Sequence, residues 1–88
     1  MDERYVKLKE QLDLQEWPGV YMFKFIVPNT PEKIAMVSAL FDNGADLKFQ
    51  PSKNGKYVSV SSKEMMLSSQ GIIDRYLEAA KIEGLIAL

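Results

Sequence analysis

The chain has 88 residues, a net charge of −1 and neither cysteine nor histidine. This length suits a single domain spanning 1–88, because two domains would each be too small to bury a stable core. The missing residue types exclude disulfides, thiol catalysis, Ser-His-Asp sites and closed zinc sites. We therefore expect no metal and no cofactor. We also expect a cytoplasmic protein without a membrane segment, since no apolar run reaches ~18 residues and 1–11 does not resemble a signal peptide.

The first segment is a predicted helical extension, residues 1–13. Tyr5, Leu8 and Leu12 recur there at helical spacing. The run Trp17-Pro18-Gly19 then ends the pattern, because proline cannot continue a helix and restricts the residue before it.

The strongest strand pattern covers residues 20–27. One face would carry Tyr21, Phe23, Phe25 and Val27, and the other Val20, Met22, Lys24 and Ile26. Burying an unpaired ammonium is costly, so Lys24 assigns its own face to the outside and the aromatic face to the core.

A second helix is predicted to begin at Pro31, with Thr30 as its N-cap. Its apolar stripe would be Ile34, Val37, Leu40 and Phe41, and Asn43-Gly44 would provide a left-handed exit. A half-exposed strand follows at 47–50, ended by Pro51.

Asn54-Gly55 predicts a hairpin with a type I′ turn, since both residues tolerate positive φ. In the next strand Val58 and Val60 would face inward, whereas Tyr57, Ser59 and Ser61 would face outward. The run Ser61-Ser62-Lys63-Glu64 is polar, so the pattern leaves the end of this strand open.

The last helix is predicted to open at Ser68 or Ser69. Its buried face would comprise Ile72, Ile73, Tyr76, Leu77 and Ala80, and Arg75 would face solvent. Gly84 would close this helix, and 85–88 could form a final short strand.

The predicted order is a helix followed by β-α-β-β-α-β. Two right-handed crossovers around a central hairpin give an α+β, ferredoxin-like sandwich: a four-stranded antiparallel sheet with two helices on one face and the other face open.

Three blocks of the sequence resemble the YbeD-like family of small bacterial domains. They are Trp17-Pro18, Tyr21-x-Phe23-Lys24-Phe25, and the run from Pro51 to Val60 with its Pro-Ser, Gly and Tyr-x-Ser-Val positions. The resemblance covers about residues 8–88. It implies a ferredoxin-like fold similar to ACT-type regulatory domains and, for some relatives, a regulatory link to lipoate metabolism.

The candidate site is the 51–59 hairpin with the open face beside it. Lysines and hydroxyls there could hold an anion or a partner's carboxylate, with a tyrosine ring as a flat wall; the candidates are Lys24, Ser52, Lys53, Lys56, Tyr57 and Ser59. A plain turn flanked by solubilising lysines explains the hairpin equally. Met22 and Ile26 could form an open-face interface, with a homodimer as its simplest form.

Our functional prediction is a non-enzymatic regulatory or interaction domain that binds a protein or a small anionic metabolite. One alternative is a single-stranded RNA binder, which the net charge and the inward aromatics disfavour. Another is a Ser-Lys hydrolase or transferase using Ser59 and Lys24, which would need a desolvated lysine. Two further groups match ordinary caps and surfaces better than cation or acid–base sites: Asp42, Asn43 and Asp46, and the pair Asp74 and Glu78.

Overall fold

The computed structural model describes residues 3–41 and 44–88. In chain order the elements of these ranges are α1 (Glu3–Leu12), β1 (Gly19–Pro28), α2 (Pro31–Ser38), β2 (Lys48–Pro51), β3 (Tyr57–Met66), α3 (Ser69–Ala79) and β4 (Ile86–Ala87). Asn43 lies outside the described residues. Gly44 has a positive φ of +87°, but it is not the predicted helix exit, because α2 ends at Ser38 with Ala39 as a right-handed cap.

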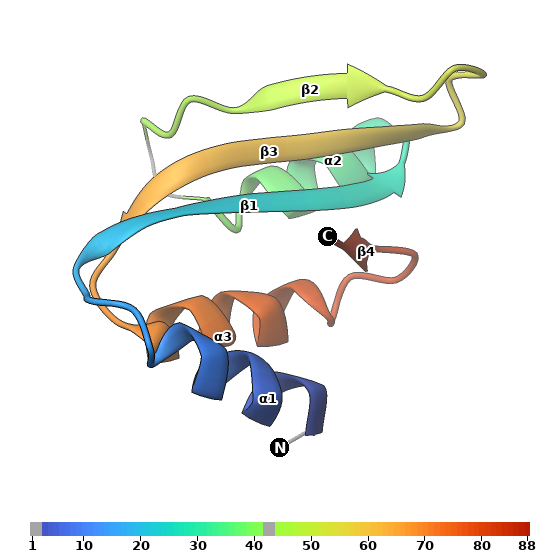
Figure 1. The fold of residues 1–88 in the computed structure, drawn as a ribbon. Coiled ribbons are helices and arrows are strands. Elements are labelled where there is room, and N and C mark those ends of the chain that lie inside the picture. The colour runs from blue at the N-terminus through green and yellow to red at the C-terminus, as the bar shows by residue number, and fades with distance from the viewer. Residues whose placement is uncertain (1–2, 42–43) are drawn as a thin grey trace.

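The four strands form one antiparallel sheet in the order β2-β3-β1-β4, so β1 and β3 are central (Figure 1). Helices α2 and α3 pack against one face of this sheet, and α1 packs against α3. The predicted α+β class, the four-stranded antiparallel sheet and the N-terminal helix are therefore confirmed.

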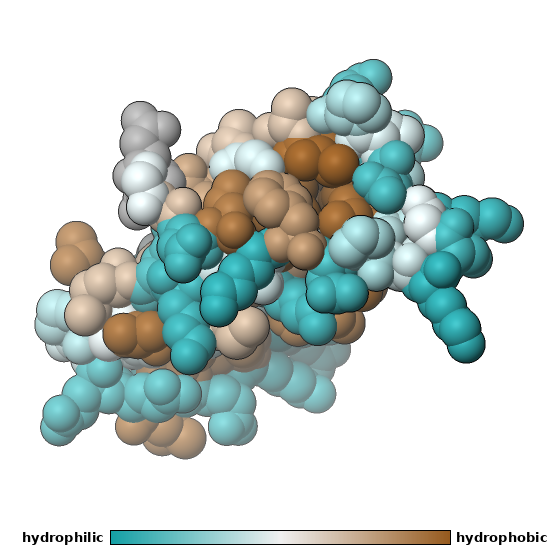
Figure 2. Space-filling model, turned by 90° about the horizontal axis from the view of Figure 1, so that it is seen from above, coloured by the Kyte–Doolittle hydropathy of each residue, from teal (hydrophilic) through white to brown (hydrophobic). Residues whose placement is uncertain are grey.

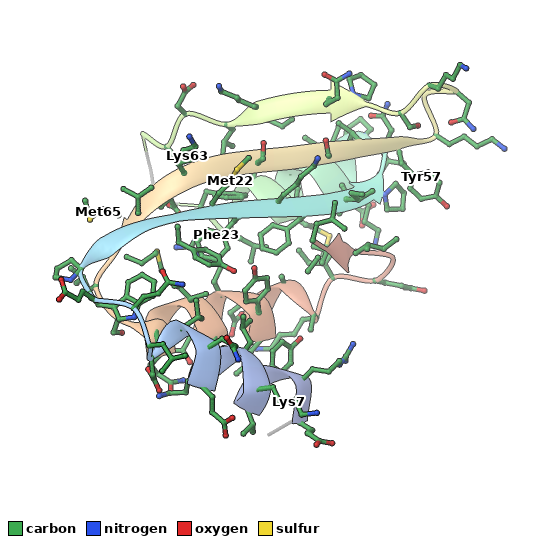
Figure 3. All side chains as sticks on the ribbon, viewed as in Figure 1. Lys7, Met22, Phe23, Tyr57, Lys63 and Met65 are labelled. Carbon is green, nitrogen blue, oxygen red and sulfur yellow. The ribbon has the colours of Figure 1, made fainter. Side chains whose placement is uncertain are left out.

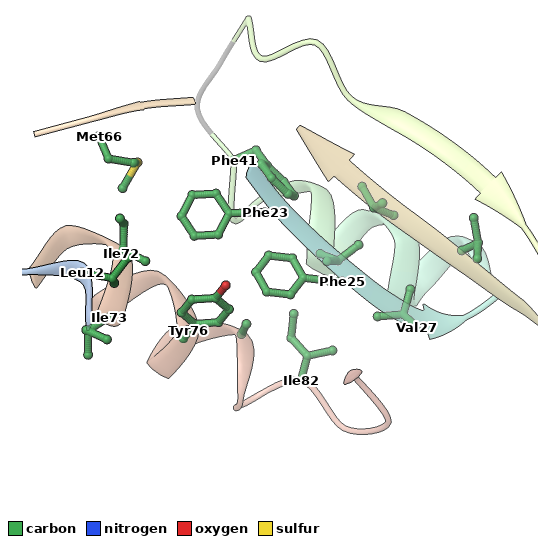
Figure 4. Packing of buried hydrophobic residues seen from close by; sticks show 14 residues of the cluster. Leu12, Phe23, Phe25, Val27, Phe41, Met66, Ile72, Ile73, Tyr76 and Ile82 are labelled. Atoms are coloured by element: carbon green, nitrogen blue, oxygen red, sulfur yellow. The ribbon is translucent and has the colours of Figure 1, made fainter. Parts of the chain in front are cut away.

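Strand β1 has the predicted parity. Phe23, Phe25 and Val27 are fully buried, whereas Met22 and Lys24 are exposed on the opposite face. The buried rings meet side chains of α3 and of the segment after α2 to form the core (Figure 4). The cost of burying an ammonium did decide which face became the core.

Helix α2 begins as predicted and ends earlier. The Thr30 Oγ1 accepts a hydrogen bond from the Lys33 N–H at 3.2 Å, which satisfies one of the free donors of the first turn. The helix ends at Ser38 and continues as turns, through which Phe41 still reaches the core. The apolar spacing therefore predicted correctly that Val37 and Phe41 are buried, but it placed the end of the helix too late.

Strand β3 runs through the polar segment to Met66. Ser62, Glu64 and Met66 point inward and are buried. Glu64 is paired with Arg75 of α3, and the Arg75 guanidinium carbon lies 4.7 Å from the centre of the Phe23 ring. The prediction that Arg75 faces solvent was wrong, because a carboxylate on the sheet and an aromatic face together hold it inside.

Helix α3 starts at the predicted cap, where the Ser68 hydroxyl accepts a hydrogen bond from the Gly71 N–H at 3.2 Å. Its buried stripe is Ile72, Ile73, Tyr76 and Ala79. The predicted burial of Leu77 and Ala80 was wrong, since both are exposed. The stripe of this helix is narrower than the apolar residues in the sequence suggest.

The end of α1 is tied to the start of α3 by a polar contact. Ser69 donates a hydrogen bond from its hydroxyl to the Asp13 carboxylate, and Lys9 donates another at 3.0 Å. The hydrogen bond from Ser69, and to a lesser extent that from Lys9, lowers the pKa of Asp13.

This contact predicts how acid affects the packing of α1. Because the pKa of Asp13 is lower in the folded state, its contribution to stability is complete above the unfolded pKa of about 4 and is lost as pH falls through the folded value. Replacing Ser69 with alanine should raise the pKa of Asp13, as measured by NMR titration of its carboxyl carbon. A Ser68→Ala control should leave that pKa in place, and an unmoved pKa in Ser69→Ala would contradict the assignment.

Candidate functional site

The 51–59 hairpin does not form the predicted type I′ turn. Gly55 has φ of +74°, but Asn54 has no positive φ, and a type I′ turn requires it at both residues. Instead the Gly55 N–H donates to the Ser52 carbonyl at 2.9 Å inside a loop closed by Ser52 N–H and the Tyr57 carbonyl at 2.8 Å. The reason is that the Asn54 side chain accepts from the Lys56 N–H at 3.0 Å and so organises a longer loop.

The loop also uses Ser52 as a structural residue. Its hydroxyl donates to the Asn54 side chain at 3.0 Å and accepts from the Tyr57 N–H at 3.1 Å. Lys53 and Lys56 are exposed at the tip. The structural reading of the hairpin thus accounts for Ser52 and Asn54, and it leaves the two exposed lysines as solubilising residues.

Two shallow depressions lie on the open face. The first, of about 200 Å³, brings together five predicted site residues with parts of β2 and β3: Lys24, Ile26, Gln50, Pro51, Ser52, Tyr57, Val58 and Ser59. The second, of about 250 Å³, is lined by Met22, Asp46, Lys48, Ser61, Ser62 and Lys63. Five of the predicted residues are therefore neighbours, whereas Met22 lines the second depression and Lys53 and Lys56 line neither.

Three lysines cross the middle of the open face. Lys24 on β1 and Lys48 on β2 stand on either side of Ser61 in the sheet register, and Lys63 follows two residues along β3. Neighbouring strands lie about 4.8 Å apart, so the Cα atoms of Lys24 and Lys48 are about 10 Å apart. We call Lys24, Lys48 and Lys63 the lysine belt. Sequence reasoning missed two of them, because Lys48 needs the register and Lys63 needs the full length of β3.

The charges of the chain are segregated between its two sides. On the open side, the lysine belt and the hairpin residues Lys53 and Lys56 make no ion pair within residues 3–41 and 44–88, and Asp46 is the acidic residue beside them. By contrast, three of the four helix-side lysines are paired with carboxylates: Lys7 with Glu3, Lys9 with Asp13 and Lys81 with Glu78. The fourth, Lys33 of α2, has no ion pair among the described residues. The net charge of −1 conceals this separation.

Ser59 and Lys24 are not arranged as a nucleophile and its base. Ile26, not Lys24, is opposite Ser59 in the register, and the Ser59 hydroxyl donates to the Gln50 carbonyl at 3.3 Å. Lys24 is exposed, whereas a base of this kind needs a desolvated amine.

A larger concavity, of about 610 Å³, lies elsewhere, between α1, α3 and β4. Tyr21 and Tyr76 meet in its wall through a hydrogen bond of 2.8 Å between their hydroxyls. Burial, and secondarily this bond, raises the pKa of Tyr76. None of the predicted site residues lines it, and no sequence pattern pointed to it, because its walls combine α1 and β1 with α3 and β4 from the other end of the chain.

Metal and membrane features are lacking in the part of the chain that the structure describes. No group of three or more potential ligands could hold a metal ion there, and Asp42 and Asn43 lie outside the described residues. None of the described helices is long and apolar enough to cross a membrane. Asp74 and Glu78 are exposed, in line with the surface reading.

Comparison with family models, with curated proteins and with solved structures gives no match. The resemblance to the YbeD-like family stays a prediction.

Proposed function

We propose that the chain is a non-enzymatic interaction domain that binds a negatively charged partner on its open sheet face and 51–59 hairpin. The observation that carries this proposal is the gathering of five lysines on that side which make no ion pair within the described residues, with Asp46 as the acidic residue described beside them. Like charges so placed repel one another, and a bound anion relieves that repulsion. A protein carboxylate surface and a small anionic metabolite are the two chemical forms of such a partner.

The proposal includes a ferredoxin-like fold of the YbeD-like kind. Two features support it: the β-α-β-β-α-β order after α1, and a sheet with β1 and β3 at its centre. A regulatory role, including a link to lipoate metabolism, rests on the family resemblance, and so does a bacterial origin. The cytoplasmic setting is part of the proposal and rests on the sequence pattern.

The competing functions lack comparable support. Base stacking on a central sheet needs outward aromatics on both middle strands, and Tyr57 is the outward aromatic of β3 whereas those of β1 point into the core. A face-to-face homodimer would place two lysine belts against each other, which like-charge repulsion disfavours. A partner with acidic groups meets neither obstacle.

A charge-reversal experiment tests this function. The variant Lys24→Glu/Lys48→Glu/Lys63→Glu should weaken binding of poly-L-glutamate at least ten-fold, as measured by fluorescence titration at low salt. The control Lys7→Glu/Lys33→Glu/Lys81→Glu has the same net charge on the helix side and should bind within about three-fold of the original chain. Equal losses in both variants would overturn a local site.

Two further experiments test whether the hairpin belongs to the site and whether RNA is the preferred ligand. Lys53→Ala/Lys56→Ala should weaken poly-L-glutamate binding without changing the circular dichroism spectrum, and unchanged affinity would remove the hairpin from the site. Preferential binding of single-stranded RNA over poly-L-glutamate, with quenching of tyrosine fluorescence, would favour the RNA-binding alternative instead.

A further inference from the structure

The open face carries an apolar patch at the end farthest from the hairpin. Val20 and Met65 stand opposite each other in the register of β1 and β3, and Met22 follows on β1. These three side chains are 62%, 63% and 51% exposed. Figure 3 shows Met22, Met65 and Lys63 on the side of the sheet away from the helices, and Phe23 on the side toward them. We call Val20, Met22 and Met65 the methionine end.

A second apolar group lies at the other end of the same face. Ile26 stands between Ser59 of β3 and Ile86 of β4, and Tyr57 lies at the start of β3. Tyr57 and Ile86 are about half exposed, at 46% and 53%. Lys24 and Lys48 lie between the two ends, whereas Lys63 stands opposite Met22 at the methionine end. Figure 2 shows hydrophilic and hydrophobic side chains side by side on the molecule seen from above. Along β1 the order is apolar, basic, apolar.

The dimensions of this pattern match one α-helix. Val20 to Ile26 is six residue steps, or about 20 Å at ~3.3 Å per residue, which is the length of a helix of about 13 residues. A helix is about 10 Å wide and would cover two strands spaced ~4.8 Å apart, and the methionine end spans β1 and β3.

We propose that the open face binds an amphipathic helix of a partner protein, with carboxylates in its middle and apolar residues at both ends. The carboxylates would meet Lys24 and Lys63 of β1 and β3, and the apolar residues would meet the methionine end and the group around Ile26. Methionine suits such a role because its flexible side chain adapts to different apolar surfaces. This inference rests on the proposed function and narrows it to a protein partner.

The face favours a helix over two other anionic partners. An added strand would pair at a sheet edge, beside β2 or beside residues 19–24 of β1, and would not cover the open face, where β1 and β3 are each other's neighbours over their whole length. A small metabolite could touch the lysine belt or one apolar end, but it could not span about 20 Å. Of the helix, the added strand and the small metabolite, only the helix can meet the lysines and both apolar ends of the face at the same time.

Two peptides of identical composition test the proposal. Each has 14 residues built from alanine, glutamate and leucine. The acid-centred peptide has four glutamates in its middle and leucines at both ends. The second peptide has the leucines in its middle and the glutamates at both ends. The acid-centred peptide should bind at least ten-fold more tightly. Its addition to the full chain labelled with ¹³C at the methionine methyl groups should shift the NMR signals of Met22 and Met65, and not that of Met36 on α2.

Variants separate this inference from the function on which it rests. The variant Met22→Ser/Met65→Ser should weaken binding of the acid-centred peptide about ten-fold and leave binding of poly-L-glutamate unchanged. The control Met36→Ser should change neither affinity. Equal binding of the two peptides, or no effect of Met22→Ser/Met65→Ser, overturns the helix and leaves the anion site standing. Failure of poly-L-glutamate itself to bind removes the proposed function. Self-association that Met22→Ser/Met65→Ser abolishes would assign the face to a second copy and overturn the proposal.

Discussion

Replacing Phe23 with alanine is expected to lower the free energy of unfolding by about 4 kcal/mol. The Phe23 ring has no exposed surface and lies at the centre of the core. Its centroid is 6.0 Å from that of Phe25, 5.8 Å from that of Tyr76 and 6.3 Å from that of Phe41. Truncation would remove these contacts and leave a cavity that the sheet and α3 cannot both close around.

Urea denaturation followed by Trp17 fluorescence would measure this loss. Trp17 is a suitable reporter because its indole N–H donates to the Leu12 carbonyl at 2.9 Å, at the junction of α1 and β1. Tyr57→Ala, a truncation of an aromatic side chain on the open face of the same sheet, serves as the control and should cost less than about 1 kcal/mol. A loss below about 1.5 kcal/mol in Phe23→Ala would contradict the central place of this ring.

The fold was predictable where one residue decided between two arrangements. Lys24 alone assigned the faces of β1, and Thr30 with Pro31 placed the start of α2. The failures had two causes, side-chain hydrogen bonds within a loop and a contact with a second element. The loop at Asn54 depends on its own side-chain hydrogen bonds, and the position of Arg75 depends on a carboxylate in another element.

The candidate site was predictable only in part, for a related reason. Tyr57, Ser59 and Lys24 follow from strand parity, and the structure does place them around one depression. Lys48 becomes part of the lysine belt through its register with Ser61, which no pattern within a single segment reveals. Net charge sums over the molecule, so a value of −1 hid five lysines on one side behind acidic residues on the other.

The polar end of β3 left the end of the strand undecided in the sequence, yet its polar side chains occupy regular strand positions. Alternation continues through Ser62 and Glu64, with polar side chains on the inward face. A carboxylate there would be costly without a cation, because burial removes its hydration. Arg75 supplies the cation from α3, so the sheet and the helix are joined at a point where packing alone would predict apolar residues.

Arg75→Ala is accordingly expected to lower the free energy of unfolding by about 3 kcal/mol. The side chains of Arg75 and Glu64 are only 13% and 5% exposed, so removal of the guanidinium deprives a buried carboxylate of its paired charge. The substitution also removes the cation from the face of the Phe23 ring. Urea denaturation measures the loss, with Lys81→Ala, which breaks an exposed ion pair, as the control that should cost less than about 1 kcal/mol.

A double substitution distinguishes the buried charge from lost packing as the cause. Arg75→Met with Glu64→Leu keeps apolar volume at both positions and leaves no charge to be compensated, so it should recover most of the stability that Arg75→Ala loses. If Arg75→Ala costs no more than Lys81→Ala, the pair is not buried in solution. If the double variant is as unstable as Arg75→Ala, the ion pair itself is what holds α3 against the end of β3.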